Sequence, residues 1–154
     1  AAIEQRLRDV DRDLHQLAQQ HPVAVRLQEI PGVGPLTATA LVGSVPHIHA
    51  FTRGRHFASW LGLTPRESSS GRRRTLGGIS KRGDRYLRSL LAHGARSVLR
   101  AAMVLARSPH RLTRLHQWGL QLRDRRGQNR AVIGVANKLA RIIWAVWSRD
   151  LAFT

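Results

Sequence analysis

The stretch DRYLRSLLAHGARSVLRAAMVLAR, residues 84–107, decides the fold class. Its apolar residues recur three and four positions apart, which is the spacing of one face of an α-helix. Asp84 directly precedes the pattern and suits a helix N-cap, so we expect a helix from there to about Arg107. The residues expected to form its buried stripe are Leu87, Leu90, Leu91, Ala95, Val98 and Leu99.

Helical patterns also occur on both sides of this stretch. We expect helices over about residues 3–17 and 23–28, from Pro35, from Thr52 as N-cap to Trp60, from Ser108-Pro109 to Arg126, and from Asn129 to Ser148. Residues 63–79 should form a Ser/Arg/Gly-rich loop, with a small hairpin as the alternative. The predicted fold class is all-α, with a helical linker or coiled-coil segment over 1–21 and a multi-helix domain over 22–154.

The helical segment at the N-terminus carries a seam of apolar residues. Its members lie four, three, four and three positions apart, as in a coiled coil, and are Ile3, Leu7, Val10, Leu14 and Leu17. The seam either packs on the body of this chain or pairs with a second copy, which would make a homo-oligomer. Because the sequence begins without Met inside this pattern, we expect a fragment of a longer protein.

Positive charge dominates the composition. The 154 residues include 26 Lys or Arg and nine Asp or Glu, for a formal net charge of +17. Of these, 22 bases and four acids lie in residues 30–154, so this part carries +18, whereas residues 1–29 carry −1. Such a body is expected to bind a polyanion, and nucleic acid is the leading candidate. Charge alone also allows a structural RNA-binding protein or an anionic membrane surface.

Composition excludes several other classes. There is no cysteine, which rules out disulfides, thiolate zinc sites and a cysteine nucleophile. The longest apolar run, residues 142–147, is far shorter than the ~20 residues of a membrane helix. We therefore expect a cytoplasmic protein with no membrane partner.

The stretch IPGVGPL, residues 30–36, contains two glycines and is expected to form a tight turn between two helices. Such a turn leaves the backbone N–H groups of Gly32, Gly34 and the next helix start free to bind one phosphate, independently of base sequence. The pattern resembles the helix-hairpin-helix DNA-binding motif, with Ile30, Val33 and Leu41 as its apolar clamp. The predicted DNA-binding residues are Gly32, Val33, Gly34 and Thr37. The alternative is a tight turn between helices that binds nothing.

A second stretch, GLTPRESSSGRRRTLGGISKRGDRYLRSLLAHGA, follows at residues 62–95. Together with IPGVGPLTATAL and FASWLGL, it resembles the C-terminal transposase domain of the IS-one-ten insertion-sequence family, and its GGISKRGD resembles the IS-eleven-eleven branch. The resemblance covers roughly residues 26–149. It implies a recombinase whose N-terminal domain, missing here, carries acidic residues that bind Mg²⁺, whereas this fragment needs no cofactor of its own. A bridge RNA would choose the donor and target DNA.

The resemblance also implies a serine nucleophile. The family's serine precedes a glycine in a Pro-x-x-x-x-Ser-Gly arrangement, which falls on Ser70, with Ser68 and Ser69 as neighbours in case of a register error. Attack on a phosphodiester would give a phosphoserine-linked DNA end. The cations expected to stabilise the developing charge are Arg72, Arg73, Arg74, Lys81 and Arg82. We expect Arg72 and Arg74 nearest, because alternation in an extended loop puts them on one side.

No general base stands out beside the serine. Glu67 and His93 are the candidates nearest in sequence. Tyr86, the only tyrosine, raises a tyrosine-recombinase alternative, although its place early in a helix favours packing or DNA contact.

Other candidate sites are weaker. His47, His49 and His56 lack nearby carboxylates, so we predict no metal site in this fragment. Trp118, Trp144 and Trp147 lie on apolar helical stripes and should pack in the core or at an oligomer interface. Lys138 and Arg141 are plausible contacts to a nucleic-acid backbone.

The sequence thus predicts a serine-dependent DNA transposase fragment, inactive without the acidic domain. The alternatives are a non-catalytic helix-hairpin-helix module that binds nucleic acid and a structural RNA-binding protein.

Overall fold

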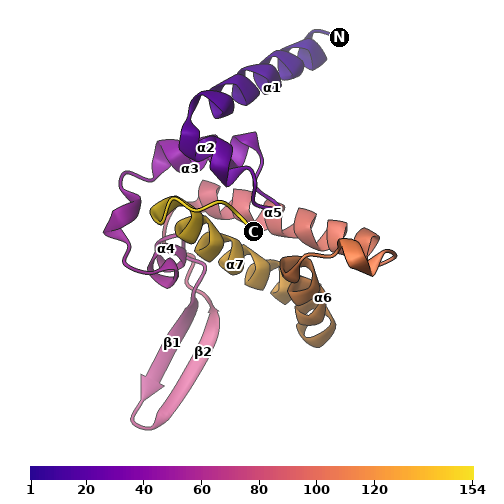
Figure 1. Ribbon diagram of the computed structural model, residues 1–154. Helices are drawn as coiled ribbons and strands as arrows, with labels where there is room; N and C mark the ends of the chain where they lie inside the picture. Colours follow the sequence, from indigo (N-terminus) through magenta and orange to yellow (C-terminus); the bar gives the residue numbers. More distant parts are fainter.

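The chain folds as a set of helices with one β-hairpin extending from them (Figure 1). This computed structural model describes the backbone of residues 1–154 and all side chains except those of residues 67–70 and 74–76. The elements are α1 (Ala2–Gln20), α2 (Pro22–Leu27), α3 (Pro35–Ser44), η1 (Ile48–Ala50), α4 (Gly54–Trp60), β1 (Pro65–Ser70), β2 (Arg73–Ile79), α5 (Arg85–Leu105), η2 (Pro109–Arg111), α6 (Arg114–Arg126) and α7 (Gln128–Ser148). The predicted helical fold is confirmed, whereas the loop expected over residues 63–79 is wrong and the alternative of a small hairpin is right, because these residues pair as two strands.

Helix α7 lies at the centre of the core. It packs against α4, α5 and α6, and its apolar residues are buried on the faces that meet them. By length and composition alone α7 could cross a membrane, but its packing here is that of the core helix of a folded domain. Helix α5 contributes its own apolar stripe to this core. Of the six residues predicted for that stripe, Leu90 is half-buried and the other five are buried.

The turn between α2 and α3 packs directly on α5. Val33 N–H donates to the Ile30 carbonyl at 3.0 Å, with Pro31 and Gly32 between them and φ of +86° at Gly32, as in a type II turn. A Cβ on Gly32 would lie 2.8 Å from the Gly94 carbonyl oxygen and 2.9 Å from Val98 Cγ2. The turn and α5 are therefore in contact backbone to backbone, which only glycine allows.

The β-hairpin is anchored where it leaves and rejoins the helices. Gly62, just after α4, has φ of +75°, and its α-carbon lies against the backbone of Arg82. Gly83, just before α5, has φ of +118° and packs in the same way on the Trp60 carbonyl. Lys81 N–H donates to the Gly62 carbonyl at 3.0 Å, which ties the two ends of the hairpin together.

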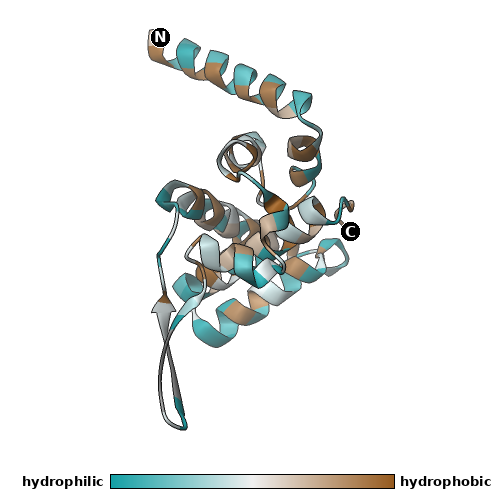
Figure 2. Ribbon diagram, turned by 90° about the vertical axis from the view of Figure 1, so that its left-hand side faces the viewer, coloured by the Kyte–Doolittle hydropathy of each residue, from teal (hydrophilic) through white to brown (hydrophobic). Residues whose placement is uncertain are grey.

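Helix α1 extends away from the body, and its brown and teal sides are visible in Figure 2. Only its last turns reach α2 and α3, where Ala18 is buried. Ile3 is 75% exposed and Leu7 60% exposed, and Val10 and Leu17 are also exposed. Within the described residues of this chain, the seam is therefore largely uncovered.

Two helix starts differ from the sequence prediction. Helix α4 is capped by Arg53 rather than Thr52, whose hydroxyl is instead hydrogen-bonded to the His56 ring at 2.9 Å. Ser108-Pro109 opens only the short η2, and α6 begins later, because Thr113 provides a stronger cap by accepting from His116 N–H. The other starts agree within one residue.

Candidate nucleic-acid interface

The α2–α3 turn presents its predicted residues in different ways. Val33 and Thr37 are buried, 5% and 7% exposed, so their side chains point into the body rather than to a ligand. Gly32 is held against α5, whereas Gly34 is exposed with no atom within 4 Å of the position of a Cβ. The expected clamp residues Ile30 and Leu41 are also buried.

Gly34 is the N-cap of α3 and has no side chain to cap the helix. Pro35 occupies the first turn, and the N–H groups of the next two residues have no acceptor within the helix. These donors, with the exposed backbone of Gly34 beside them, form a surface that can approach an anion closely. Its partial positive charge suits a phosphate and reads no base.

The tip of the β-hairpin is built by a glycine. Gly71 and Arg72 connect β1 to β2, and φ is +59° at Gly71 but negative at Arg72, as in a type II′ turn. Ser70 ends β1 and pairs in register with Arg73, the first residue of β2. The backbone thus places Ser70 beside the tip, and the Ser70 side chain lies outside the described residues.

The predicted cations separate into two groups. Arg72 and Arg73 are exposed at the tip, and the Arg74 side chain lies outside the described part of the chain. Since Arg72 belongs to the turn, alternation along a strand does not relate it to Arg74. The last pair of the hairpin, Pro65 with Ile79, lies about 17 Å from Ser70 for five strand residues, and Lys81 and Arg82 follow Ile79 at this base.

The hairpin base contains a residue that sequence reasoning missed. Arg88, in the first turn of α5, donates from Nη1 to the Leu61 carbonyl at 3.3 Å. Asp84 caps the same turn by accepting from Leu87 N–H at 3.0 Å. These contacts fix the direction in which the hairpin leaves the body. The glycines on both sides and the cap at Asp84 were the sequence signals for this junction.

His93 and the alternative nucleophile Tyr86 lie on α5, not at the hairpin tip. Glu67 has a side chain outside the described residues, and His93 is exposed well inside α5. Tyr86 is 55% exposed at the start of α5, close to the base of the hairpin rather than to its tip. In the part of the chain whose side chains are described, no group of three or more His, Asp or Glu residues gathers as metal ligands would.

The tryptophans belong to the packing of the helices. Trp118, Trp144 and Trp147 are partly buried against the core, as expected from the sequence. Trp144 Nε1 donates to the Phe51 carbonyl at 2.9 Å, and Lys138 Nζ lies 5.7 Å from the centre of the Trp118 ring. Arg141 is exposed, and its backbone lies against Gly54 at the start of α4.

His116 is a second residue that the sequence analysis missed. It is 7% exposed, and its Nδ1 accepts from the Thr113 backbone N–H at 3.2 Å. Burial lowers the pKa of His116 from its ordinary value of 6.5. The neutral ring therefore completes the N-terminal cap of α6, which is a structural role.

Few of the many cations are neutralised by neighbours. Among residues with described side chains, the ion pairs of arginine are Arg12 with Asp9 and Arg26 with Asp150, both outside the turn and the hairpin. The remaining positive surface is therefore available to a polyanion.

Comparison with known proteins relates the chain to transposases. Residues 24–111 match the sequence pattern described as the transposase IS116/IS110/IS902 family. The chain is 43% identical over 142 residues to "Transposase for insertion sequence element IS1111A" of Coxiella burnetii, covering 92% of this chain and 37% of that protein. It is 40% identical over 153 residues to "Probable family 20 transposase" of Pseudomonas aeruginosa, covering 98% and 43%. The chain thus spans about two fifths of the length of these curated relatives.

Proposed function

Because the chain belongs to the IS116/IS110/IS902 transposase family, we propose that it is the part of a DNA transposase that binds DNA and supplies Ser70 as nucleophile. The observation that carries the proposal is the backbone of the hairpin tip. Ser70 stands next to a glycine turn, with the exposed Arg72 and Arg73 beside it. A phosphodiester can approach such a tip without steric hindrance from the body of the protein.

The proposed reaction exchanges one phosphate ester for another. Ser70 Oγ loses its proton and attacks phosphorus, the P–O bond to one deoxyribose breaks, and that oxygen takes up a proton. The DNA end is then held as a phosphoserine ester, and the reverse attack by a deoxyribose hydroxyl rejoins a strand without an external energy source. Guanidinium groups of Arg72 and Arg73 would stabilise the added negative charge on the phosphorus oxygens.

The family resemblance implies acidic, Mg²⁺-binding residues, and we propose that the complete enzyme supplies them from a part of the transposase other than this chain. The guide RNA and the element ends and target DNA are the proposed partners of the complete protein. The turn at 30–37 would hold a DNA backbone through the N–H groups at the start of α3.

The exposed seam of α1 supports self-association of the proposed enzyme. Four apolar side chains at coiled-coil spacing face solvent, and their burial against a second α1 would remove this surface from water. Replacing Leu7 and Val10 by lysine should convert a dimer to a monomer in analytical ultracentrifugation. An unchanged sedimentation coefficient would exclude the seam as the interface.

The nucleophile is tested by Ser70→Ala in the full-length transposase, with Ser69→Ala as the matched control. We expect Ser70→Ala to abolish strand exchange while DNA affinity stays within twofold, and Ser69→Ala to remain active. Strand exchange by Ser70→Ala would exclude the catalytic assignment. The chain would then be a non-catalytic module that binds nucleic acid through the α2–α3 turn.

A further inference from the structure

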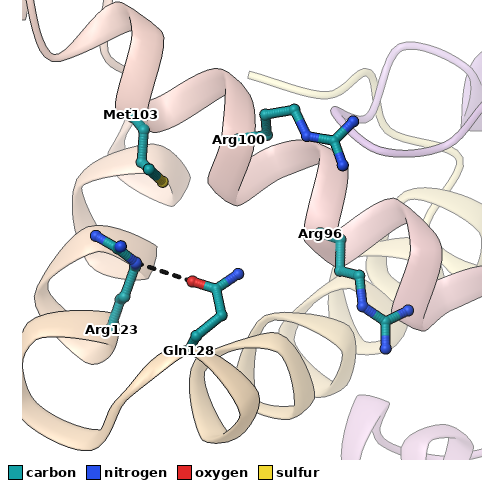
Figure 3. A pocket seen from close by; sticks show the side chains of 5 residues that line it. All are labelled: Arg96, Arg100, Met103, Arg123 and Gln128. Carbon is teal, nitrogen blue, oxygen red and sulfur yellow. Dashed lines mark hydrogen bonds between the residues drawn. The ribbon is translucent and has the colours of Figure 1, made fainter.

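A basic pocket lies between the second half of α5 and the corner where α6 meets α7 (Figure 3). Its volume is about 280 Å³. It is lined by Arg96, Arg100, Met103, Arg123 and Gln128. None of these residues belongs to the α2–α3 turn or to the β-hairpin.

The α5 side of the pocket is one row of side chains. Arg96, Arg100 and Met103 are at i, i+4 and i+7, so they lie above one another, about 6 Å and then 4.5 Å apart along the helix axis. The buried stripe of α5 lies on a different face. Both arginines are exposed, and Met103 is 45% exposed, so this row faces solvent and not the core.

The opposite side of the pocket is held in place by a hydrogen bond. Arg123 Nε donates to Gln128 Oε1 at 2.8 Å, across the Gly127 corner between α6 and α7. This bond uses only one of the five N–H groups of the guanidinium and leaves its two Nη groups for another acceptor. Gln128 keeps its side-chain NH₂ as a further donor.

Three cations therefore share one pocket without a compensating anion from the protein. Of the carboxylates whose side chains are described, none pairs with Arg96, Arg100 or Arg123. Asp124 is next in sequence to Arg123, but successive residues point in directions about 100° apart on a helix, and Asp124 does not line the pocket. In Figure 3 the guanidinium groups of Arg96 and Arg100 point away from Arg123, so the three positive charges line the pocket without meeting one another.

We propose that this pocket binds a phosphodiester of a nucleic-acid strand, with the three guanidinium groups donating to the phosphate oxygens. Planar N–H forks suit phosphate oxygens, and the exposed thioether of Met103 offers an apolar surface for the adjoining sugar. A polymer fits better than a free anion, because the exposed Arg126, three residues after Arg123 and on the same face of α6, extends the positive surface beyond the pocket.

The pocket would be a second contact, separate from the site of proposed chemistry. Arg96 is 11 residues beyond Arg85, so it lies about 16 Å along α5 from the base of the hairpin. A strand held there would contact the protein away from Ser70. The inference therefore goes beyond the proposed transposase chemistry and does not require it.

The test compares two triple variants of the 154-residue chain that lose the same charge. One replaces the three pocket arginines by glutamine, and the other replaces Arg6, Arg8 and Arg12 of α1. Affinity is measured by fluorescence anisotropy as a function of salt, with a random-sequence 20-bp DNA duplex and an RNA stem-loop as separate probes. Circular dichroism checks that both variants keep their helix content.

We expect the pocket variant to lose about tenfold or more in affinity for at least one probe, and its slope of log K against log salt to decrease by about 1 to 2. The α1 variant should lose less than threefold. The probe that is affected identifies the strand as DNA or RNA. Arg100→Lys, which keeps the charge but loses the fork, should bind between the unaltered chain and the pocket variant.

Equal losses in the two triple variants would overturn the proposal, because the effect would then be one of net charge alone. The same holds if neither probe is affected. Ser70→Ala gives an independent result, since loss of strand exchange there with normal binding at the pocket separates the two proposals.

Discussion

The two glycines of the α2–α3 turn should respond oppositely to the same substitution. Gly32→Ala places a Cβ at φ of +86°, which costs about 1–2 kcal/mol for an L-residue. That Cβ would also lie 2.8 Å from a carbonyl oxygen and 2.9 Å from a methyl group, and overpacking of this kind costs about 1–3 kcal/mol. The free energy of unfolding should therefore fall by about 2–5 kcal/mol, a large part of the ~5–15 kcal/mol of a typical domain.

Gly34→Ala is the matched control. Gly34 has φ of −98°, and nothing lies within 4 Å of its Cβ position, so the free energy of unfolding should change by less than about 1 kcal/mol. In a thermal melt followed by circular dichroism, Gly32→Ala should lower Tm by about 4–20 °C and Gly34→Ala by about 4 °C at most. If the turn binds a phosphate as proposed, Gly34→Ala should also weaken DNA binding, because the new methyl group obstructs the exposed backbone.

Gly32→Ala should therefore melt at a clearly lower temperature than Gly34→Ala. Similar melting temperatures for the two variants would refute the backbone contact between this turn and α5. Normal DNA affinity of a well-folded Gly34→Ala would refute phosphate binding by the turn while leaving its packing intact.

Three further predictions concern stability. Gly83→Ala should destabilise the chain by about 2 kcal/mol or more, because its Cβ would collide with the Trp60 carbonyl, whereas Gly78→Ala, which has open space, should not; equal urea midpoints would contradict this. Asp84→Ala removes the cap of α5 and should cost about 1 kcal/mol, so an unchanged midpoint would argue against the cap. Because burial lowers the pKa of His116, the stability it contributes is present above pH 6.5 and is lost as pH falls through the folded-state pKa; the loss is about 1.4 kcal/mol for each pKa unit by which folding lowers this pKa. His116→Gln should therefore flatten the pH dependence of the free energy of unfolding, measured by urea titration between pH 7.5 and 5. An identical pH profile for the variant and the unaltered chain would exclude the assignment.

The helices could be predicted because their signals are local. The stripe of α5 and the cap at Asp84 depend on residues within a few turns, and both occur where expected. The start of α6 was misplaced because Ser108-Pro109 resembles a helix start, whereas the cap at Thr113 needs the ring of His116. Local propensity did not distinguish these two starts.

The arrangement of the candidate site could not be read from the sequence in the same way. The contact between Gly32 and Gly94 joins residues 62 positions apart, and the glycine pattern reports only that small residues are needed. The separation of Lys81 and Arg82 from the hairpin tip follows from strand pairing, which a loop assignment lacks. The pocket at Arg96, Arg100 and Arg123 depends on how α5 and α6 pack, so composition reveals its charge but not its place.

The central claim is tested most directly by trapping the covalent intermediate. The full-length transposase is incubated with a suicide DNA substrate that cannot be rejoined, digested with protease, and analysed by mass spectrometry for the residue that retains a nucleotide. The account predicts a phosphodiester adduct on Ser70. An adduct on Tyr86, or on Ser68 or Ser69 with none on Ser70, would contradict it.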